Sequence, residues 1–157
     1  MKITLLLMGK TDDKYLQEGI SVYEGRIKHY ISYSREEIPD IKGRSSLNRS
    51  QIKEQEGVLI LKRVENTDLI ILLDENGRDM SSIEFSQKLG KWSISGIKSI
   101  IFVVGGAYGF SDAVYERADE KLSLSKMTFS HQMVRLFFAE QLYRAFTILK
   151  GEPYHHE

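Results

Sequence analysis

The chain has 157 residues, a length that fits one compact domain burying roughly 70% of its unfolded surface. Its 22 basic and 22 acidic residues cancel, which weakly disfavours a free-standing nucleic-acid binder but still permits a local basic patch or a dimer that pools two surfaces. The sequence has no cysteine, so disulfides and thiolate metal sites are excluded. Its opening apolar run is shorter than a secretory leader needs and no stretch reaches roughly 20 apolar residues, so we expect a soluble cytoplasmic protein with no membrane partner.

Ten elements are predicted from apolar spacing and turn residues. In chain order they are a strand 2–8, a helix 13–30, a strand 33–39, a helix 50–62, a strand 68–74, a helix 82–92, a strand 98–104, a helix 111–118, a strand 121–125 and a helix 131–150. Asp12 or Asp13 is placed to cap the first helix and Ser111 the fourth. Ser50 opens the second helix, with Glu54 at the spacing of a side chain that reaches back to the helix start. The turn "ENGRDMSS" and the polar loop 40–50 separate elements, and we assign the loop no function.

The order of these elements predicts an α/β fold. Strands alternate with helices, and the runs 68–74 and 98–104 are apolar throughout rather than alternating. Both features are typical of a mostly parallel sheet that is covered by helices on both faces. With no repeat or linker in the chain, we predict a single domain over residues 1–157.

A glycine-rich turn ends the strand 98–104 in the stretch "VVGGAYGF". The dinucleotide-binding fingerprint would need glycines at 105, 107 and 110, but Ala107 and Phe110 occupy the last two of these positions. No Gly-Lys-Ser/Thr follows, so a triphosphate loop is also excluded. On its own, the turn indicates only a tight connection from strand to helix that requires positive φ.

Two further strand ends add to this turn. Leu73 and Asp74 end one predicted strand, and the segment 122–132 follows another. Because ligands of open parallel sheets bind beyond the carboxyl ends of the strands, we expect these ends to form one shallow cleft. Its small residues and exposed backbone suit a flat purine ring with a short polar tail.

Three segments carry a resemblance to a known family: "MKITLLLMGK", "VVGGAYGF" and "LSLSKMTFSHQMVRLFFAEQLYRAFTILKGEPYH". Together they resemble the bacterial ribosomal large subunit methyltransferase H family, whose SPOUT-class members methylate N3 of a pseudouridine in 23S rRNA. The likeness covers the whole chain and is densest from Gly105 to His155. It implies a C-terminal trefoil knot within a cofactor-binding part at about 66–157, S-adenosylmethionine (AdoMet) as cofactor, and a homodimer with each active site near the subunit interface.

Positions matching the family imply a set of cofactor-binding residues. These are Leu73, Gly105, Gly106, Leu124, Ser125, Lys126, Met127, Thr128 and Phe129. The bare turn at Gly105 and Gly106 would let AdoMet lie against the backbone. The chain departs from the family at Ser130, where a proline before His131 is usual and would stiffen the loop.

The resemblance also implies catalytic candidates in the last helix and the tail. Arg144 stands four residues after Glu140, a spacing that by itself predicts only a surface ion pair. The tail "PYHHE" (153–157) would by itself be a frayed end. Glu140, Tyr143 and Arg144 match polar positions of the family on this helix, so Arg144 becomes a candidate RNA or substrate contact. In the family the tail is ordered near the cofactor, so Tyr154 and His155 become candidates for substrate contact or proton handling.

The other polar residues near the last helix have less specific interpretations. We expect His131 to be a hydrogen-bonded structural histidine at the helix start, and Arg135 to face either a phosphate or a neighbouring carboxylate. The apolar stripe of this helix is interpreted as core or dimer interface; it comprises Leu136, Phe137, Phe138, Leu142 and Phe146. No histidine pair has the spacing of a metal site, so none is predicted.

Three functions are compatible with the sequence. The first is AdoMet-dependent methylation of a pseudouridine in 23S rRNA within the ribosome. The second keeps the fold and moves the substrate to tRNA, which the neutral net charge mildly disfavours because a binder acting alone needs a basic surface. The third is a non-catalytic, ribosome-associated binding module.

Overall fold

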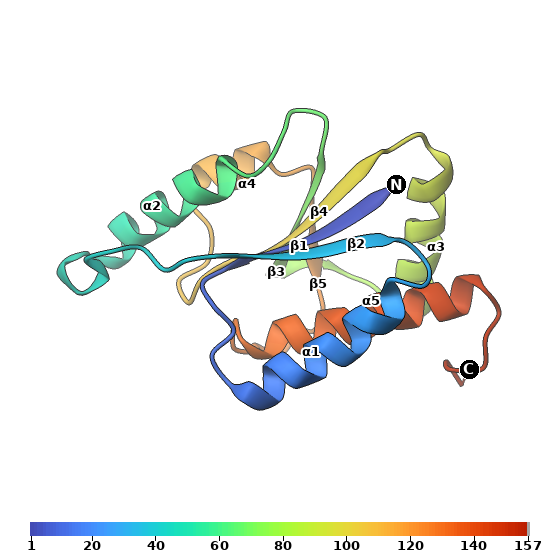
Figure 1. Ribbon diagram of the computed structural model, residues 1–157. Coiled ribbons are helices and arrows are strands. Elements are labelled where there is room, and N and C mark those ends of the chain that lie inside the picture. Colours follow the sequence, from blue (N-terminus) through green and yellow to red (C-terminus); the bar gives the residue numbers. More distant parts are fainter. Residues whose placement is uncertain (157) are drawn as a thin grey trace.

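A five-stranded sheet organises the chain, and the computed structural model describes residues 1–156 of it (Figure 1). The elements are β1 (Lys2–Met8), α1 (Lys14–Ile27), β2 (Ser32–Ile38), a short 3-10 turn (Arg44–Ser46), α2 (Arg49–Leu61), β3 (Leu69–Asp79), α3 (Ser82–Ile94), β4 (Ser99–Val104), α4 (Asp112–Arg117), β5 (Glu120–Ser123) and α5 (Met133–Leu149). The strand order is β2-β1-β4-β3-β5, and every pairing is parallel. The predicted α/β class and the alternation of strands with helices are confirmed.

Helices cover both faces of the sheet, with α1, α3 and α5 on one side and α2 and α4 on the other (Figure 1). Neighbouring residues of one strand therefore enter different cores: Phe102 packs with Phe138 on the α5 side, whereas Val103 packs with Val114 on the α4 side. Because both faces are buried, the central strands need apolar residues at every position, which is the pattern the sequence shows.

β3 is longer than the sequence predicts. The expected turn after residue 74 is instead extended backbone that pairs with β5 as far as Asp79. A register shift between Leu73 and Arg78 interrupts this pairing, as in a β-bulge. A Cβ on Gly77 would lie 2.7 Å from the backbone nitrogen of Leu122, so glycine allows the bulged strand to lie against β5.

The start of α2 also differs from the prediction. Asn48 caps the helix instead of Ser50, and Gln51, not Glu54, supplies the side chain that reaches back to the helix start and so completes a capping box. The Asn48 Oδ1 accepts from the Gln51 N–H at 2.8 Å, and the Gln51 Oε1 accepts from the Asn48 N–H at 3.0 Å. The Asn48 and Gln51 side chains accept from backbone N–H groups that the first turn of a helix leaves free. The helix cap therefore lies two residues earlier than expected.

The remaining boundaries agree with the prediction to within a few residues. Ser111 caps α4 as predicted, accepting from the N–H of Val114. Asp13 takes the cap position of α1 without a side-chain hydrogen bond, and this helix ends at Ile27 rather than at residue 30. No helix within residues 1–156 combines the length and the apolar content needed to cross a bilayer. Glu157 of the predicted tail lies outside the described residues.

Candidate functional site

A cavity of about 760 Å³ lies at the carboxyl ends of β4 and β5 and beside the middle of β3, at residues 73–76. β3 is the neighbour of both β4 and β5 in the sheet, so the glycine turn, the middle of β3 and the segment after β5 meet here. The predicted cleft is therefore confirmed. Its volume falls within the range of about 300–1,000 Å³ that small-molecule sites have.

Eight of the nine predicted cofactor-binding residues line this cavity. They are Leu73, Gly105, Gly106, Leu124, Ser125, Met127, Thr128 and Phe129. Lys126 is exposed and does not line it. Three segments that are far apart in the sequence therefore line a single cavity: Leu73 on β3, the glycine turn and the segment after β5.

The glycines of the turn serve two purposes, of which one is the predicted positive φ. Only Gly109 has a positive φ, of +83°, and its N–H donates to the Gly106 carbonyl at 3.2 Å. A Cβ on Gly105 would lie 3.0 Å from the ring of Phe110, and one on Gly106 would lie 2.6 Å from the carboxylate of Glu56. Gly105 and Gly106 therefore make room for protein side chains packed against the turn, not for an unusual backbone angle.

Glu56 is the buried acid behind this turn. Its side chain is 3% exposed, and its Oε2 lies 3.5 Å from a guanidinium nitrogen of Arg44. Burial raises the pKa of Glu56, and the nearby Arg44 opposes that rise. The Oε1 has no hydrogen-bond partner among the described residues.

Side chains and backbone bond to one another along the segment after β5. The Ser123 hydroxyl donates to the Ser125 carbonyl at 2.8 Å, and the Ser125 hydroxyl accepts from the Met127 N–H at 2.9 Å. The Thr128 hydroxyl donates to Glu75 on β3 at 2.6 Å, which ties the segment to the neighbouring strand. These bonds hold an irregular backbone in one shape beside the cavity.

An acidic wall formed by Asp74 and Glu75 borders the cavity at β3. The Tyr115 hydroxyl donates to Asp74, whose other oxygen accepts from the Asn76 N–H at 2.8 Å. Burial and the bond to Asp74 raise the pKa of Tyr115, so its phenol stays protonated and remains a donor. Asp74, as the polar last residue of the predicted strand 68–74, is the sequence signal for this wall, whereas nothing in the sequence indicated Tyr115.

Arg135 joins the start of α5 to the end of β1, and both expectations for it are wrong. Its side chain is fully buried, so it faces no solvent, and its hydrogen-bond partners within residues 1–156 are carbonyl and hydroxyl oxygens rather than a carboxylate. The Nη1 donates to the Gly9 carbonyl at 3.0 Å and to the Thr11 hydroxyl at 2.9 Å; the Nη2 donates to the Met8 carbonyl at 2.9 Å. The Nε donates to the His131 carbonyl at 3.1 Å, so Arg135 fixes the segment that borders the cavity.

Ser130 and His131 occupy the last turn before α5. The Ser130 hydroxyl accepts from the N–H of Met133, the first residue of α5, at 3.1 Å and so satisfies a donor that the helix leaves free, a bond that a proline could not make. The His131 side chain lines the cavity rather than forming the structural hydrogen bond that we expected, since none to its ring is found within residues 1–156. Burial and the positive charge of Arg135 lower the pKa of His131.

The three predicted catalytic residues form one cluster with Glu140 near the end of α5. Arg144 donates to the Glu140 Oε1 from Nε at 3.1 Å and from Nη2 at 2.6 Å. The Arg144 Nη1 lies 3.1 Å from the His155 Nδ1, and its guanidinium carbon lies 4.8 Å from the centre of the Tyr154 ring. The Tyr154 hydroxyl donates to the same Glu140 oxygen at 2.9 Å. Burial and the bond to Glu140 raise the pKa of Tyr154.

The tail that carries Tyr154 and His155 is packed against the last helix. The Tyr154 ring contacts that of Tyr143 at a centroid distance of 4.7 Å, and Glu152 accepts from the hydroxyl of Tyr30, in the turn after α1, at 2.6 Å. That hydrogen bond raises the pKa of Tyr30 to about 12. The tail is therefore ordered, but it is not at the cavity of its own chain.

The cavity and the catalytic cluster are separate within one chain. Val134 is the only residue of α5 among those lining the cavity. At about 1.5 Å of rise per residue, Arg144 lies roughly 15 Å further along the helix. The structure thus forms two groups of predicted site residues, and a single copy does not join them.

The predicted apolar stripe of α5 is split between core and surface. Phe138, Leu142 and Phe146 are buried in the core on that side of the sheet. Phe137 is 39% exposed and packs on Phe129 at a ring distance of 4.8 Å.

Comparison with known proteins gives consistent findings along the whole chain. A family model described as "Predicted SPOUT methyltransferase" matches residues 1–155. A protein named "Ribosomal RNA large subunit methyltransferase H" from Christiangramia forsetii is 58% identical over 99% of both chains. The protein of the same name from Flavobacterium johnsoniae is 57% identical over 100% of both, and that from Bacteroides fragilis is 50% identical over 100% of both.

Among solved structures, a probable methylase family protein from Haemophilus influenzae has a similar fold. The TM-score is 0.54 with 12% sequence identity, and the match covers 95% of this chain and 66% of that one. At this identity the likeness concerns the fold alone.

Proposed function

Since the chain belongs to the SPOUT methyltransferase family, we propose that it transfers a methyl group from AdoMet to N3 of a pseudouridine in 23S rRNA of the large ribosomal subunit. The observation that carries this proposal is the agreement, over the full length of the chain, with relatives named as large-subunit rRNA methyltransferases. We place the activity in the cytoplasm and in a single domain whose cofactor-binding part begins near residue 66.

The lining of the cavity fits AdoMet. Leu73, Leu124 and Phe129 offer apolar surface for an adenine ring, while backbone groups of the glycine turn are available to its polar edge. Asp74 and Glu75 supply negative charge suited to ribose hydroxyls and to a cationic sulfur. When bound, AdoMet supplies an activated methyl group, so the protein need only position the acceptor and manage its proton.

The cluster around Arg144 supplies what the acceptor needs. N3 of pseudouridine is a weakly acidic imide that becomes nucleophilic when it loses its proton. The Arg144 guanidinium, held by Glu140, is a donor that would stabilise the resulting anion through a neighbouring carbonyl oxygen. We assign proton handling to His155 and substrate contact to Tyr154, both of which lie beside this guanidinium.

A homodimer would bring the two groups together. Because Arg144 lies roughly 15 Å along α5 from the cavity of its own chain, we propose that the cluster of one subunit completes the cavity of the other. The exposed Phe137, beside the cavity at Phe129, is surface that a second copy would cover.

Methyl transfer to defined RNA tests the function. The purified protein and labelled AdoMet are incubated with assembled ribosomes and, separately, with bulk tRNA, and the product nucleoside is identified by mass spectrometry. We expect a methylated pseudouridine from 23S rRNA only. Label on tRNA alone would favour the alternative substrate, and AdoMet binding without any transfer would favour a non-catalytic module.

Mixed dimers test the shared site. We expect Arg144→Ala and Leu124→Arg each to be inactive, the second because a charged side chain fills the cavity. If each active site takes its cavity from one subunit and its cluster from the other, mixing the two variants restores part of the activity. No recovery in a mixture shown by mass spectrometry to contain heterodimers would contradict the arrangement.

A further inference from the structure

A run of basic residues without an intervening acid lies beside the cavity. Residues 41–53 contain Lys42, Arg44, Arg49 and Lys53 and no acidic residue. Arg49 and Lys53, on the first turns of α2, line the cavity together with Tyr108 from the glycine turn. We call Arg44, Arg49, Lys53 and Tyr108 the basic lip.

Two guanidinium groups of the basic lip lie on one aromatic ring. The guanidinium carbon of Arg49 is 5.0 Å from the centre of the Tyr108 ring, and that of Arg44 is 5.6 Å from it. Arg44 is held a second time by the buried carboxylate of Glu56. Cation–π contacts and this ion pair orient the two side chains without covering their outer donors.

The charges of Arg49 and Lys53 are not neutralised by the protein. Within the part of the chain that the structure describes, neither side chain has a carboxylate within the 4.0 Å of an ion pair. Arg35, Arg63 and Arg144 elsewhere on the surface each have such a partner. Like charges held close together without counter-charges repel one another, so their proximity favours an anionic ligand.

The position of the basic lip suits it to bind and orient the substrate rather than to take part in the reaction. It borders the cavity at α2, whereas Asp74 and Glu75 border it at β3, so the entrance is basic at one wall and acidic at another. A polyanion approaching this entrance is attracted to one side and repelled from the other. Such an arrangement orients a strand as well as attracting it.

We propose that the basic lip binds backbone phosphates of the RNA next to the target nucleotide. This inference rests on the proposed function, and it assigns the segment 41–53 a role in docking the substrate. Arginine forks match phosphate oxygens in two-point contacts, and lysine adds a flexible point charge. A neutral protein can then bind RNA at one site without attracting nucleic acid over its whole surface.

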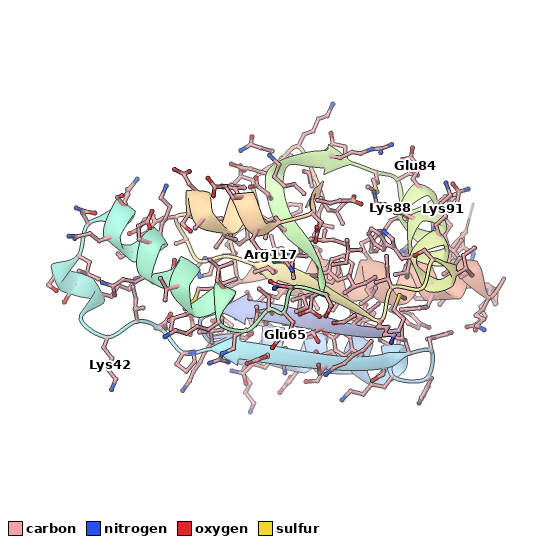
Figure 2. All side chains as sticks on the ribbon, turned by 90° about the horizontal axis from the view of Figure 1, so that it is seen from above. Lys42, Glu65, Glu84, Lys88, Lys91 and Arg117 are labelled. Atoms are coloured by element: carbon pink, nitrogen blue, oxygen red, sulfur yellow. The ribbon has the colours of Figure 1, made fainter. Side chains whose placement is uncertain are left out.

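The test variant is Arg49→Ala with Lys53→Ala, which leaves Arg44 in place so that Glu56 keeps its partner. The matched control is Lys91→Ala with Lys98→Ala, two exposed lysines on α3 and just before β4. Figure 2 shows Lys42 of the segment 41–53 and Lys91 at opposite ends of the molecule. Thermal unfolding confirms that both variants fold.

Salt dependence is the decisive measurement. Binding to ribosomes is measured from low to moderate KCl concentration, and the slope of log K against log [KCl] is compared. We expect the slope of the test variant to be shallower by about 2 and its affinity at low salt to fall on the order of tenfold, with the control unchanged. Affinity for AdoMet, measured by calorimetry, stays at the wild-type value.

Three results would overturn the basic lip as an RNA contact. If the salt-dependence slope of the test variant equals that of the control, the basic lip does not contact RNA phosphates. A tenfold loss of AdoMet affinity would assign Arg49 and Lys53 to the cofactor carboxylate, and a shift to monomers in mass photometry would assign them to the subunit interface. If wild-type protein fails to methylate ribosomes, the proposed function itself fails; if it succeeds and the slope is unchanged, only the basic lip fails.

Discussion

Arg135 and Arg144 lie on the same helix, but one is sealed in the protein and the other is part of a surface cluster. The side chain of Arg135 is fully buried, and its partners are three carbonyl oxygens and a hydroxyl. The side chain of Arg144 is 24% exposed, and its partners are a carboxylate, an imidazole and an aromatic ring. The difference in burial separates an arginine that holds the fold from one that is available to a substrate.

The cost of burial explains why the two environments differ. Taking a guanidinium out of water is expensive, and burial lowers the pKa of Arg135 accordingly. Its donors must therefore all be satisfied, which fixes its position between β1 and the start of α5. Arg144 stays in contact with water, so it can exchange a partner for substrate at small cost.

Removing Arg135 is the strongest way to test this contrast. We expect Arg135→Met to lower the free energy of unfolding by about 3–5 kcal/mol, because the carbonyls of Met8 and Gly9 lose buried donors. Arg144→Met, the matched change on the same helix, should cost less than about 1 kcal/mol. Urea denaturation measures both, and equal losses would contradict the contrast.

Methyl-transfer activity should depend on Arg144, the arginine that contributes less to stability. Arg144→Ala should reduce methyl transfer about 100-fold or more at unchanged AdoMet affinity, because a donor to the developing anion is lost. Arg144→Lys should not rescue it, since lysine cannot hold Glu140 and reach His155 at the same time. Arg26→Ala is the control, because Arg26 also lies over an aromatic ring, that of Tyr143 at 5.4 Å. A similar loss in Arg26→Ala would show a nonspecific effect.

The same two arginines show what a sequence can predict. The bond from Arg144 to Glu140 follows from a spacing of four residues on a helix, so the local sequence is enough to predict it. The partners of Arg135 lie on the chain near Met8 and Gly9, more than 120 residues earlier, and no local pattern indicates them. Burial of an arginine among carbonyls depends on the tertiary structure alone.

The fold followed the sequence more closely than the site did. Apolar runs on the central strands predicted a sheet covered on both faces, and the rule for strand ends predicted the cleft. The extension of β3 to Asp79 was missed because "ENGRD" has the composition of a turn, and its pairing with β5 depends on a bulge. Tyr108 and Arg49 were missed because the cation–π contact joins segments that are separate in the sequence.

Ser130, an exposed residue just before α5, tests the end of the helix that Arg135 holds. Ser130→Ala should cost about 1 kcal/mol of stability, because the Met133 N–H loses its cap. Ser130→Pro also removes the cap but restricts the unfolded chain, which returns about 0.4–1 kcal/mol, so its net effect should be close to zero. Urea denaturation distinguishes the two. A proline variant less stable than the alanine variant would mean that the backbone here does not accept the fixed φ of proline.

The smallest expected effect is a dependence on pH at His131, next to Arg135. Burial, and then the charge of Arg135, lower the pKa of His131, and Asp12 and Asp40 oppose this. As pH falls through about 6.5, the ordinary value, the unfolded chain binds a proton that the folded state resists, so stability decreases on acidification. In His131→Asn this decrease should be smaller, whereas His29→Asn, a change at an exposed residue, should follow the wild-type curve. Denaturation at pH 8, 7, 6 and 5 measures the difference, and parallel curves for wild type and His131→Asn would show that this end of α5 is insensitive to protonation.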